Sequence, residues 1–300
     1  MDKKIELIIV GAQKAGTTSL NRYLSQHPKI YTHFTLEFGM FLDIDSYNKG
    51  FDYFYKNTVA NTVKQNINKT AFVAKRVGLM YNNDLLLKLK QHNSDVKIIA
   101  VIRNPIERAF SAFWYCKNNG MEPYAAFEDA IFINDSSRFK ANEKFKKNCD
   151  YIERSSYLKH LKNLYSIFPE ENIKLFLFEE MITDLNKYLN EMCTLINQNN
   201  FQFNSSIKYN EGREAKSFLL SKLLAPSKKN ILINFLPVKQ RVMLKQRLKG
   251  ANTIKKNKAE TKHVINENTR AHLKNIFQPD MEELASFTKL PLKKYWSEFF

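Results

Sequence analysis

The feature that most constrains the fold is the N-terminal stretch LIIVGAQKAGTTS, residues 7–19. Its first four residues form an unbroken apolar run, which is typical of a parallel strand buried on both faces. Gly11 and Gly16 then frame a short loop, and a helix is predicted from Thr17 to about Gln26. A strand that passes through such a loop into a helix predicts a layered α/β sheet.

Two further apolar runs have the length and composition of buried strands: VKIIAVI at 96–102 and NIKLFLF at 172–178. A weaker candidate strand lies at 71–74. Helices are predicted from Pro105 to about Lys117, over 152–167 and over about 184–196. Strands that alternate with helices favour a central parallel sheet covered by helices, a three-layer α/β/α fold.

Two segments that are distant in sequence are expected to face one crevice of this sheet. In parallel α/β sheets, ligands bind beyond the carboxyl ends of the strands. The loop at 11–18 follows the first predicted strand, and Arg103 follows the strand at 96–102. The binding site is therefore expected to contain both.

The loop matches only part of the phosphate-binding loop of nucleotide triphosphatases, GxxxxGK[ST]. The two glycines have the right spacing, but Thr17 stands where that loop has its lysine, and Lys14 comes earlier. Backbone N–H groups and the positive end of the helix still favour an oxyanion. We therefore expect a phosphate-like ligand. No carboxylate closes the strand at 96–102 to hold magnesium, so the residues that a nucleotide triphosphatase needs are incomplete. The alternative is a turn in which these residues serve geometry alone.

The second segment, RNPIERAFS at 103–111, places Arg103 at a strand end and Ser111 about two helical turns beyond. A planar guanidinium matches a phosphate with two parallel hydrogen bonds, and a hydroxyl can add a third. The alternative is an ion pair for Arg103 and a packing role for Ser111.

Together the two segments resemble the nucleotide site of sulfotransferases that use 3′-phosphoadenosine 5′-phosphosulfate (PAPS). VGAQKAGTTSL is similar to the family's 5′-phosphosulfate loop, and VIRNPIERAFSAF is similar to its 3′-phosphate motif. The resemblance covers nearly the whole chain and is nearest to the bacterial and carbohydrate-type branch. It implies a P-loop sulfotransferase fold with extra C-terminal helices, PAPS as donor, PAP as product and no metal.

The resemblance also implies a domain organisation and a set of ligand-binding residues. We expect one domain over 1–300, with a nucleotide-binding core at about 5–200 and a basic helical part at about 211–300. Arg103 and Ser111 are implied to hold the 3′-phosphate, and Tyr157 to contact the nucleotide. The implied 5′-phosphosulfate residues are Lys14, Ala15, Gly16, Thr17, Thr18 and Ser19.

Transfer of a sulfuryl group needs a general base for the acceptor and positive charge at the leaving oxygen. The resemblance implies Glu37 as this base and Lys14 and Lys75 as the catalytic cations. Cytosolic members of the family place a histidine two residues after the second lysine, where this chain has Val77. His33 is the rival base. The alternatives are a solvated loop acid for Glu37 and an exposed basic residue for Lys75.

The chain carries a formal charge of +17, which favours an anionic partner. Between Lys222 and Lys262, twelve Lys or Arg stand against one acid, Glu260, so this segment holds +11 of the total. Its middle, 237–250, is predicted to form a basic helix. Polysaccharides, oligosaccharides and lipid headgroups are the expected acceptors, with peripheral membrane contact as one possible role of the segment. Nucleic acid is not expected, because it explains the charge but not the two phosphate motifs.

Two rival functions follow from the same features: a P-loop nucleotide or small-molecule kinase, and a non-catalytic polyanion-binding protein. The displaced lysine and the missing magnesium acid disfavour the kinase. The apolar run from Ile5 to Val10 is too short for a signal peptide, and no stretch is long enough to span a bilayer. Cys116, Cys149 and Cys193 are widely spaced, which predicts buried free thiols and a cytoplasmic location.

Overall fold

The computed structural model describes residues 4–33, 35–58, 70–133, 148–207, 213–215, 253–255 and 264–300, and the single residues Gln240, Leu244 and Arg247. Its contacts divide the chain into two compact units. The first unit comprises Met1–Asn104, Ser156–Tyr209 and Asp280–Phe300, and the second comprises Pro105–Ser155 and Asn210–Pro279. One domain over the whole chain stays a prediction.

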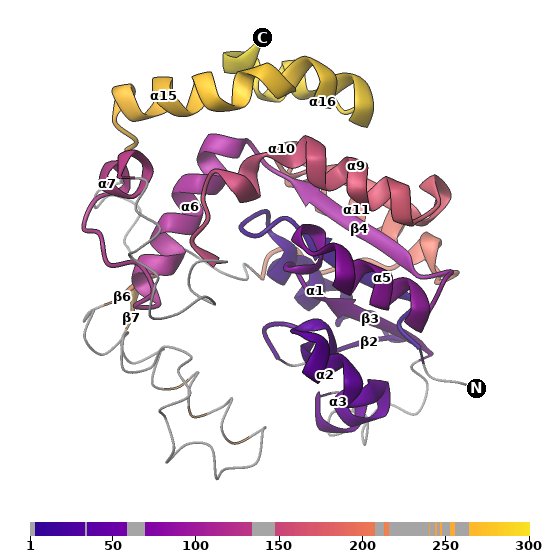
Figure 1. Cartoon of the computed structure of the whole chain (residues 1–300). Coiled ribbons are helices and arrows are strands. Elements are labelled where there is room, and N and C mark those ends of the chain that lie inside the picture. The colour runs from indigo at the N-terminus through magenta and orange to yellow at the C-terminus, as the bar shows by residue number, and fades with distance from the viewer. Residues whose placement is uncertain are drawn as a thin grey trace. The chain divides into compact units, whose positions relative to one another are not determined.

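A five-stranded parallel sheet forms the centre of the first unit (Figure 1). Its strands in chain order are β1 (Leu7–Gly11), β2 (Ile30–Thr32), β3 (Ala71–Lys75), β4 (Lys97–Ile102) and β5 (Ile173–Leu177). They lie side by side in the order β2-β3-β1-β4-β5, and every neighbouring pair is parallel. The predicted strands are confirmed. The sequence did not indicate β2, because three residues are too few to show a periodicity.

The helices of the first unit cover this sheet. They are α1 (Thr17–Leu24), α2 (Ile44–Asn48), α3 (Gly50–Thr58), α5 (Asn83–His92), α9 (Tyr157–Ile167), α10 (Phe178–Met181), α11 (Leu185–Leu195), α16 (Met281–Thr288) and α17 (Leu292–Tyr295). Helices α5 and α9 contact each other, and α1 contacts α11. Right-handed crossovers in this strand order put α1 on one face and α5 with α9 on the other. The α/β/α prediction is confirmed.

Most predicted helix boundaries agree with the structure. The helix expected over 152–167 begins only at Tyr157, because residues Glu153–Ser155 form a 3₁₀ turn. The helix expected from about 184 begins at Leu185, where the carboxylate of Asp184 accepts the backbone N–H of Lys187 as an N-cap.

The second unit contains α6 (Pro105–Asn118), α7 (Phe127–Phe132), α15 (Glu267–Phe277) and an antiparallel pair, β6 (Arg213–Ala215) with β7 (Thr253–Lys255). Helices α6 and α15 contact each other. Arg108 on α6 is fully buried and donates to the Ser155 hydroxyl and the Tyr151 carbonyl, each at 2.6 Å. These bonds satisfy part of the hydrogen-bonding capacity of the guanidinium, whose burial without partners would be costly in free energy.

All three cysteines are buried free thiols, as predicted. Among the residues that the structure describes, no helix combines the length and the apolar character needed to cross a bilayer. The predicted helix over 237–250 lies largely outside the described residues. Of its members, Gln240, Leu244 and Arg247 are helical and exposed.

Candidate active site

The loop between β1 and α1 has a backbone conformation and close contacts that require glycine at two positions. Gly16 has a φ of 76°, and a Cβ added there would come within 3.0 Å of the Phe178 ring. A Cβ at Gly11 would come within 2.6 Å of the Met80 sulfur. Lys14 also has a positive φ, 72°, which is uncommon for a residue with a side chain. Such a backbone conformation persists only where the surrounding structure holds it, and it is concentrated at functional sites.

Arg103 meets this loop at the carboxyl ends of β1 and β4. Its Nη1 donates to the carbonyl of Lys14 at 3.1 Å, and its guanidinium lies 5.1 Å from the centre of the Phe178 ring. The Tyr157 hydroxyl donates to the Arg103 carbonyl at 2.7 Å. Three residues that the sequence singled out, Lys14, Arg103 and Tyr157, are therefore neighbours.

The residue after Arg103 is fixed by acids that sequence reasoning missed. The backbone N–H of Asn104 donates to Glu179 Oε1 at 2.9 Å, and its side-chain amide donates to Glu298 Oε1 at 2.8 Å. Glu179 belongs to the short helix that follows β5, and Glu298 lies near the C-terminus. The pair of acids after the third predicted strand was a signal for Glu179, whereas nothing local to Asn104 pointed to Glu298.

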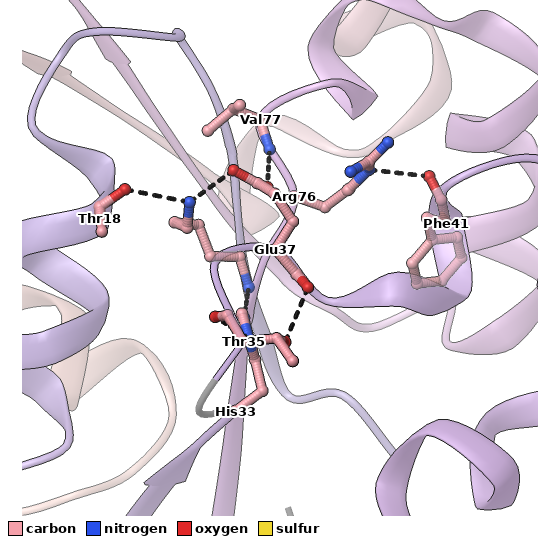
Figure 2. Close-up of polar contacts among 8 residues, drawn as sticks. Thr18, His33, Thr35, Glu37, Phe41, Arg76 and Val77 are labelled. Carbon is pink, nitrogen blue, oxygen red and sulfur yellow. Dashed lines mark hydrogen bonds and ion pairs between the residues drawn. The ribbon is translucent and has the colours of Figure 1, made fainter. Parts of the chain in front are cut away.

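A second group of predicted residues gathers around Glu37 (Figure 2). Glu37 Oε1 lies 2.6 Å from Lys75 Nζ, and Oε2 accepts the backbone N–H of Val77 at 3.0 Å. The same ammonium donates to the Thr18 hydroxyl on α1 at 3.2 Å. The Lys75 side chain is 1% exposed and that of Glu37 is 22% exposed, so Glu37 is the more open of the two side chains.

Burial sets the electrostatics of Lys75. Removal from water lowers the pKa of its ammonium, and the neighbouring carboxylate of Glu37 opposes this by favouring the charged form. A buried ammonium beside the carboxylate of a partly exposed side chain can supply both a proton acceptor and a positive charge. That combination suits a reaction in which one oxygen loses a proton while another gains negative charge.

His33, the rival base, is buried and has hydrogen bonds on both ring nitrogens. Its Nε2 accepts the backbone N–H of Lys75 at 3.0 Å, and its Nδ1 faces the carbonyl and the hydroxyl of Thr35 at 2.9 and 3.0 Å. Burial first, and the charge of Lys75 second, lower the pKa of His33 to about 3. Neither nitrogen is open to an acceptor molecule.

The remaining predicted residues lie on the loop and on α6. Ala15 and Thr17 are buried, whereas Gly16 and Ser19 are partly exposed at the start of α1. Ser111 lies on α6 in the second unit and is partly exposed, and its pairing with Arg103 stays a prediction. Within the described part of the chain, no three His, Cys, Asp or Glu side chains form a group able to hold a metal ion.

Known proteins match this chain over most of its length. The family model described as the sulfotransferase domain matches residues 4–284. The bifunctional heparan sulfate N-deacetylase/N-sulfotransferase 1 of Caenorhabditis briggsae is 21% identical over 218 residues, which cover 69% of this chain and 24% of that protein. The mouse heparan sulfate glucosamine 3-O-sulfotransferase 3B1 is 25% identical over 185 residues, covering 60% of this chain and 42% of that protein.

A crystal structure of a sulfotransferase from Alicyclobacillus acidocaldarius has the same fold. Its TM-score is 0.63 at 20% identity, and the match covers 98% of this chain and 99% of that one. The chain spans about a quarter or less of the N-deacetylase/N-sulfotransferases that it matches.

Proposed function

This chain belongs to the sulfotransferase domain family, and we propose that it transfers the sulfuryl group of PAPS to a hydroxyl or amine of a carbohydrate. The observation that carries this proposal is the contact of Glu37 and Thr18 with one ammonium, that of Lys75. It joins a candidate base to the anion-binding loop. PAPS supplies the sulfuryl group on a bridging oxygen, which stays with the PAP product.

Glu37 is the base in this proposal. Both of its oxygens already accept one hydrogen bond, from Lys75 and from Val77, but a carboxylate oxygen has two lone pairs. Glu37 therefore retains the capacity to accept the proton of an acceptor hydroxyl. His33 is unsuited to this task because both ring nitrogens are engaged and burial lowers the pKa of the ring to about 3, so it binds a proton poorly.

Lys14 and Lys75 stabilise the negative charge that develops in the transition state of the proposed reaction. In this proposal Lys14, on the strained loop, stabilises the charge on the leaving oxygen, and Lys75, whose ammonium contacts the Thr18 hydroxyl, stabilises the charge on the sulfuryl oxygens. When Glu37 takes the proton, it loses the charge that attracts Lys75. The attraction between the two groups then weakens, which leaves more of the positive charge of Lys75 to stabilise the sulfuryl oxygens. The residues proposed to hold the nucleotide are Lys14, Ala15, Gly16, Thr17, Thr18, Ser19, Arg103, Ser111 and Tyr157.

A glycan that contains glucosamine is the proposed acceptor class. Curated relatives carry heparan sulfate in their names, and the segment 222–262 of this chain holds +11, which favours an acidic polymer. An anionic lipid surface is the second candidate for the same segment, with peripheral contact only.

The test is a transfer assay with ³⁵S-labelled PAPS on de-N-sulfated heparin, on a neutral glycan and on lipid vesicles. Label on the glucosamine polymer is the expected result. Thermal stabilisation by 3′,5′-ADP, by ATP with magnesium and by a DNA oligomer separates this function from a kinase and from a polyanion-binding protein. Stabilisation by ATP with magnesium alone, and no label on any acceptor, would contradict the proposal.

A further inference from the structure

We propose that His33 and Thr35 are positioning residues that hold Glu37 and Lys75 in their reactive arrangement; this inference rests on the function proposed above. Neither side chain needs to touch a substrate. Their role is to join the main chain of the two reactive residues, which come from segments about forty residues apart (Figure 2).

The contacts form a closed ring of hydrogen bonds. The backbone N–H of Lys75 donates to His33 Nε2 at 3.0 Å, and His33 Nδ1 lies 3.0 Å from the Thr35 hydroxyl. That hydroxyl donates to the backbone carbonyl of Glu37 at 2.9 Å. The ring closes where Lys75 Nζ meets Glu37 Oε1 at 2.6 Å.

The donors and acceptors in this ring fix the tautomer of His33. A backbone N–H can only donate, so Nε2 must be the unprotonated nitrogen and Nδ1 must carry the hydrogen. A second proton on Nε2 would point at the N–H of Lys75 and break the bond. His33 therefore acts as a neutral bridge, with one acceptor and one donor.

Packing makes the bridge stiff. His33 is 3% exposed, and its ring lies 5.7 Å from the ring of Phe38, which packs in turn on Phe54 and Phe72. The backbone N–H of Phe38 donates to the carbonyl of Lys75 at 2.8 Å. The segment that carries His33 and Glu37 therefore has two hydrogen bonds to the main chain of Lys75, one from Phe38 and one through His33. Side chains locked by packing and hydrogen bonds are what holds a catalytic group in place.

Loss of the bridge affects the chemical step rather than nucleotide binding. Without His33, the N–H of Lys75 is left buried without its acceptor, and the loop that carries Glu37 loses one of its two main-chain links to Lys75 on β3. The hydrogen bond between Arg103 and Lys14 involves neither His33 nor Thr35, so nucleotide binding should not depend on the bridge. A displacement of about 1 Å at a reacting group costs about 10²-fold in rate.

The experiment compares His33→Ala, His33→Gln, Thr35→Val and Thr35→Ser in the full chain. Each variant is measured for kcat with labelled PAPS, for 3′,5′-ADP affinity by calorimetry and for its Tm. His33→Ala should lower kcat by about 10²-fold and leave 3′,5′-ADP affinity unchanged. His33→Gln keeps one acceptor and one donor and should restore part of kcat. Thr35→Val should lose roughly tenfold and Thr35→Ser much less.

His27→Ala is the matched control. His27 is equally buried, accepts the backbone N–H of Lys29 and contacts the carbonyl of Asn199, but it lies at the other end of α1. It reports the general cost of deleting a hydrogen-bonded buried histidine. Equal losses of kcat in the His27 and His33 variants, or unchanged kcat in both His33→Ala and Thr35→Val, would overturn the positioning role.

Two further readouts keep the outcomes distinct. Nitrogen-15 spectra of ring-labelled histidine should show His33 neutral with the proton on Nδ1, and a ring that carries both protons at neutral pH would overturn the bridge. Glu37→Gln is measured in parallel, because full activity in that variant contradicts the proposed base whatever His33 does. A slow Glu37→Gln with fully active His33 and Thr35 variants contradicts the positioning role alone.

Discussion

Lys75 Nζ contacts Glu37 Oε1 at 2.6 Å and the Thr18 hydroxyl at 3.2 Å, so one buried ammonium joins the loop after β2 to the start of α1. These three residues come from segments that share no local sequence relationship. An acid with an adjacent cation and a hydroxyl at a helix N-terminus is a suitable arrangement for moving a proton beside a developing negative charge.

The first prediction concerns the proton acceptor. Glu37→Gln keeps the shape and the hydrogen bond from Val77 but cannot take a proton, so we expect transfer to slow by about 10²- to 10⁴-fold. Affinity for 3′,5′-ADP should stay at the wild-type value, because the nucleotide residues are unchanged. Steady-state transfer rates and calorimetry measure the two quantities.

Asp45→Asn is the control for that experiment, since Asp45 is an exposed acid on α2. It should be as active as the wild type. If Glu37→Gln is also fully active, the base lies elsewhere.

The second prediction concerns the leaving oxygen. Lys14→Ala removes one cation from the loop and should cost about 2.7–4 kcal/mol of transition-state stabilisation, or about 10²- to 10³-fold in kcat. Lys14→Met is measured alongside, because it removes the charge and keeps the length of the side chain, and Lys29→Ala serves as an exposed lysine control. Near-normal kcat in Lys14→Met would remove this role.

The sequence predicted the fold well where apolar runs are long. β1, β4 and β5 each bury nearly every residue, so their composition alone distinguishes them from surface segments. β2 has three residues and depends on its pairing with β3, which no local pattern reveals.

The sequence singled out residues of the candidate site but not their contacts with one another. Lys14, Arg103 and Tyr157 follow from motifs, and the structure brings them together. The bond between Asn104 and Glu298 joins residues 194 positions apart, and the ring through His33 depends on the register of the folded chain. Such pairings are products of tertiary packing, and their members look like ordinary polar residues in the sequence.

The third prediction concerns the 3′-phosphate. Arg103→Ala should weaken binding of 3′,5′-ADP much more than binding of 5′-AMP, because charge-assisted bidentate contacts are the strong kind. Arg103→Lys should recover only part of the loss, since an ammonium lacks the planar pair of donors. Calorimetry with both nucleotides decides the assignment, and an equal loss for the two would refute it. Ser111→Ala should show the same preference in a weaker form.

The fourth prediction concerns stability against acid. The pKa of His33 falls from an ordinary 6.5 to about 3 in the folded protein. Between these two pH values, His33 is protonated in the unfolded chain and neutral in the folded protein. The resulting stabilisation is complete above pH 6.5 and is lost as the pH falls from there toward 3. Over the pH range in which His33 is protonated in the unfolded chain but not in the folded protein, the free energy of unfolding falls by about 1.4 kcal/mol per pH unit on acidification.

Urea unfolding at several pH values measures this slope in the wild type and in His33→Gln, which has no titrating ring. The wild type should lose stability faster on acidification in this window. Parallel curves for the two proteins would mean that His33 titrates normally when folded.

The last prediction concerns the basic segment from Lys222 to Lys262. Its charge of +11 repels itself unless an anion is near, so we expect it to meet the acceptor rather than the nucleotide. Screening at physiological salt limits such attraction to about 8–10 Å. The acceptor KM should therefore rise steeply with salt, and 3′,5′-ADP affinity should change less, because the residues proposed to hold the nucleotide are partly buried.

Neutralising Lys245, Arg247 and Lys249 together separates the acceptor from the nucleotide. Arg247 is exposed, so its replacement disturbs no buried contact. The triple variant should raise the acceptor KM and flatten its salt dependence, while kcat at saturating acceptor and 3′,5′-ADP affinity stay at wild-type values. Neutralising the exposed Lys162, Lys289 and Lys293 removes the same charge from the first unit as a control. An unchanged KM in the triple variant, with no loss of binding to anionic vesicles, would leave the segment as a solvated surface, because a charge that binds a partner must weaken that binding when it is removed.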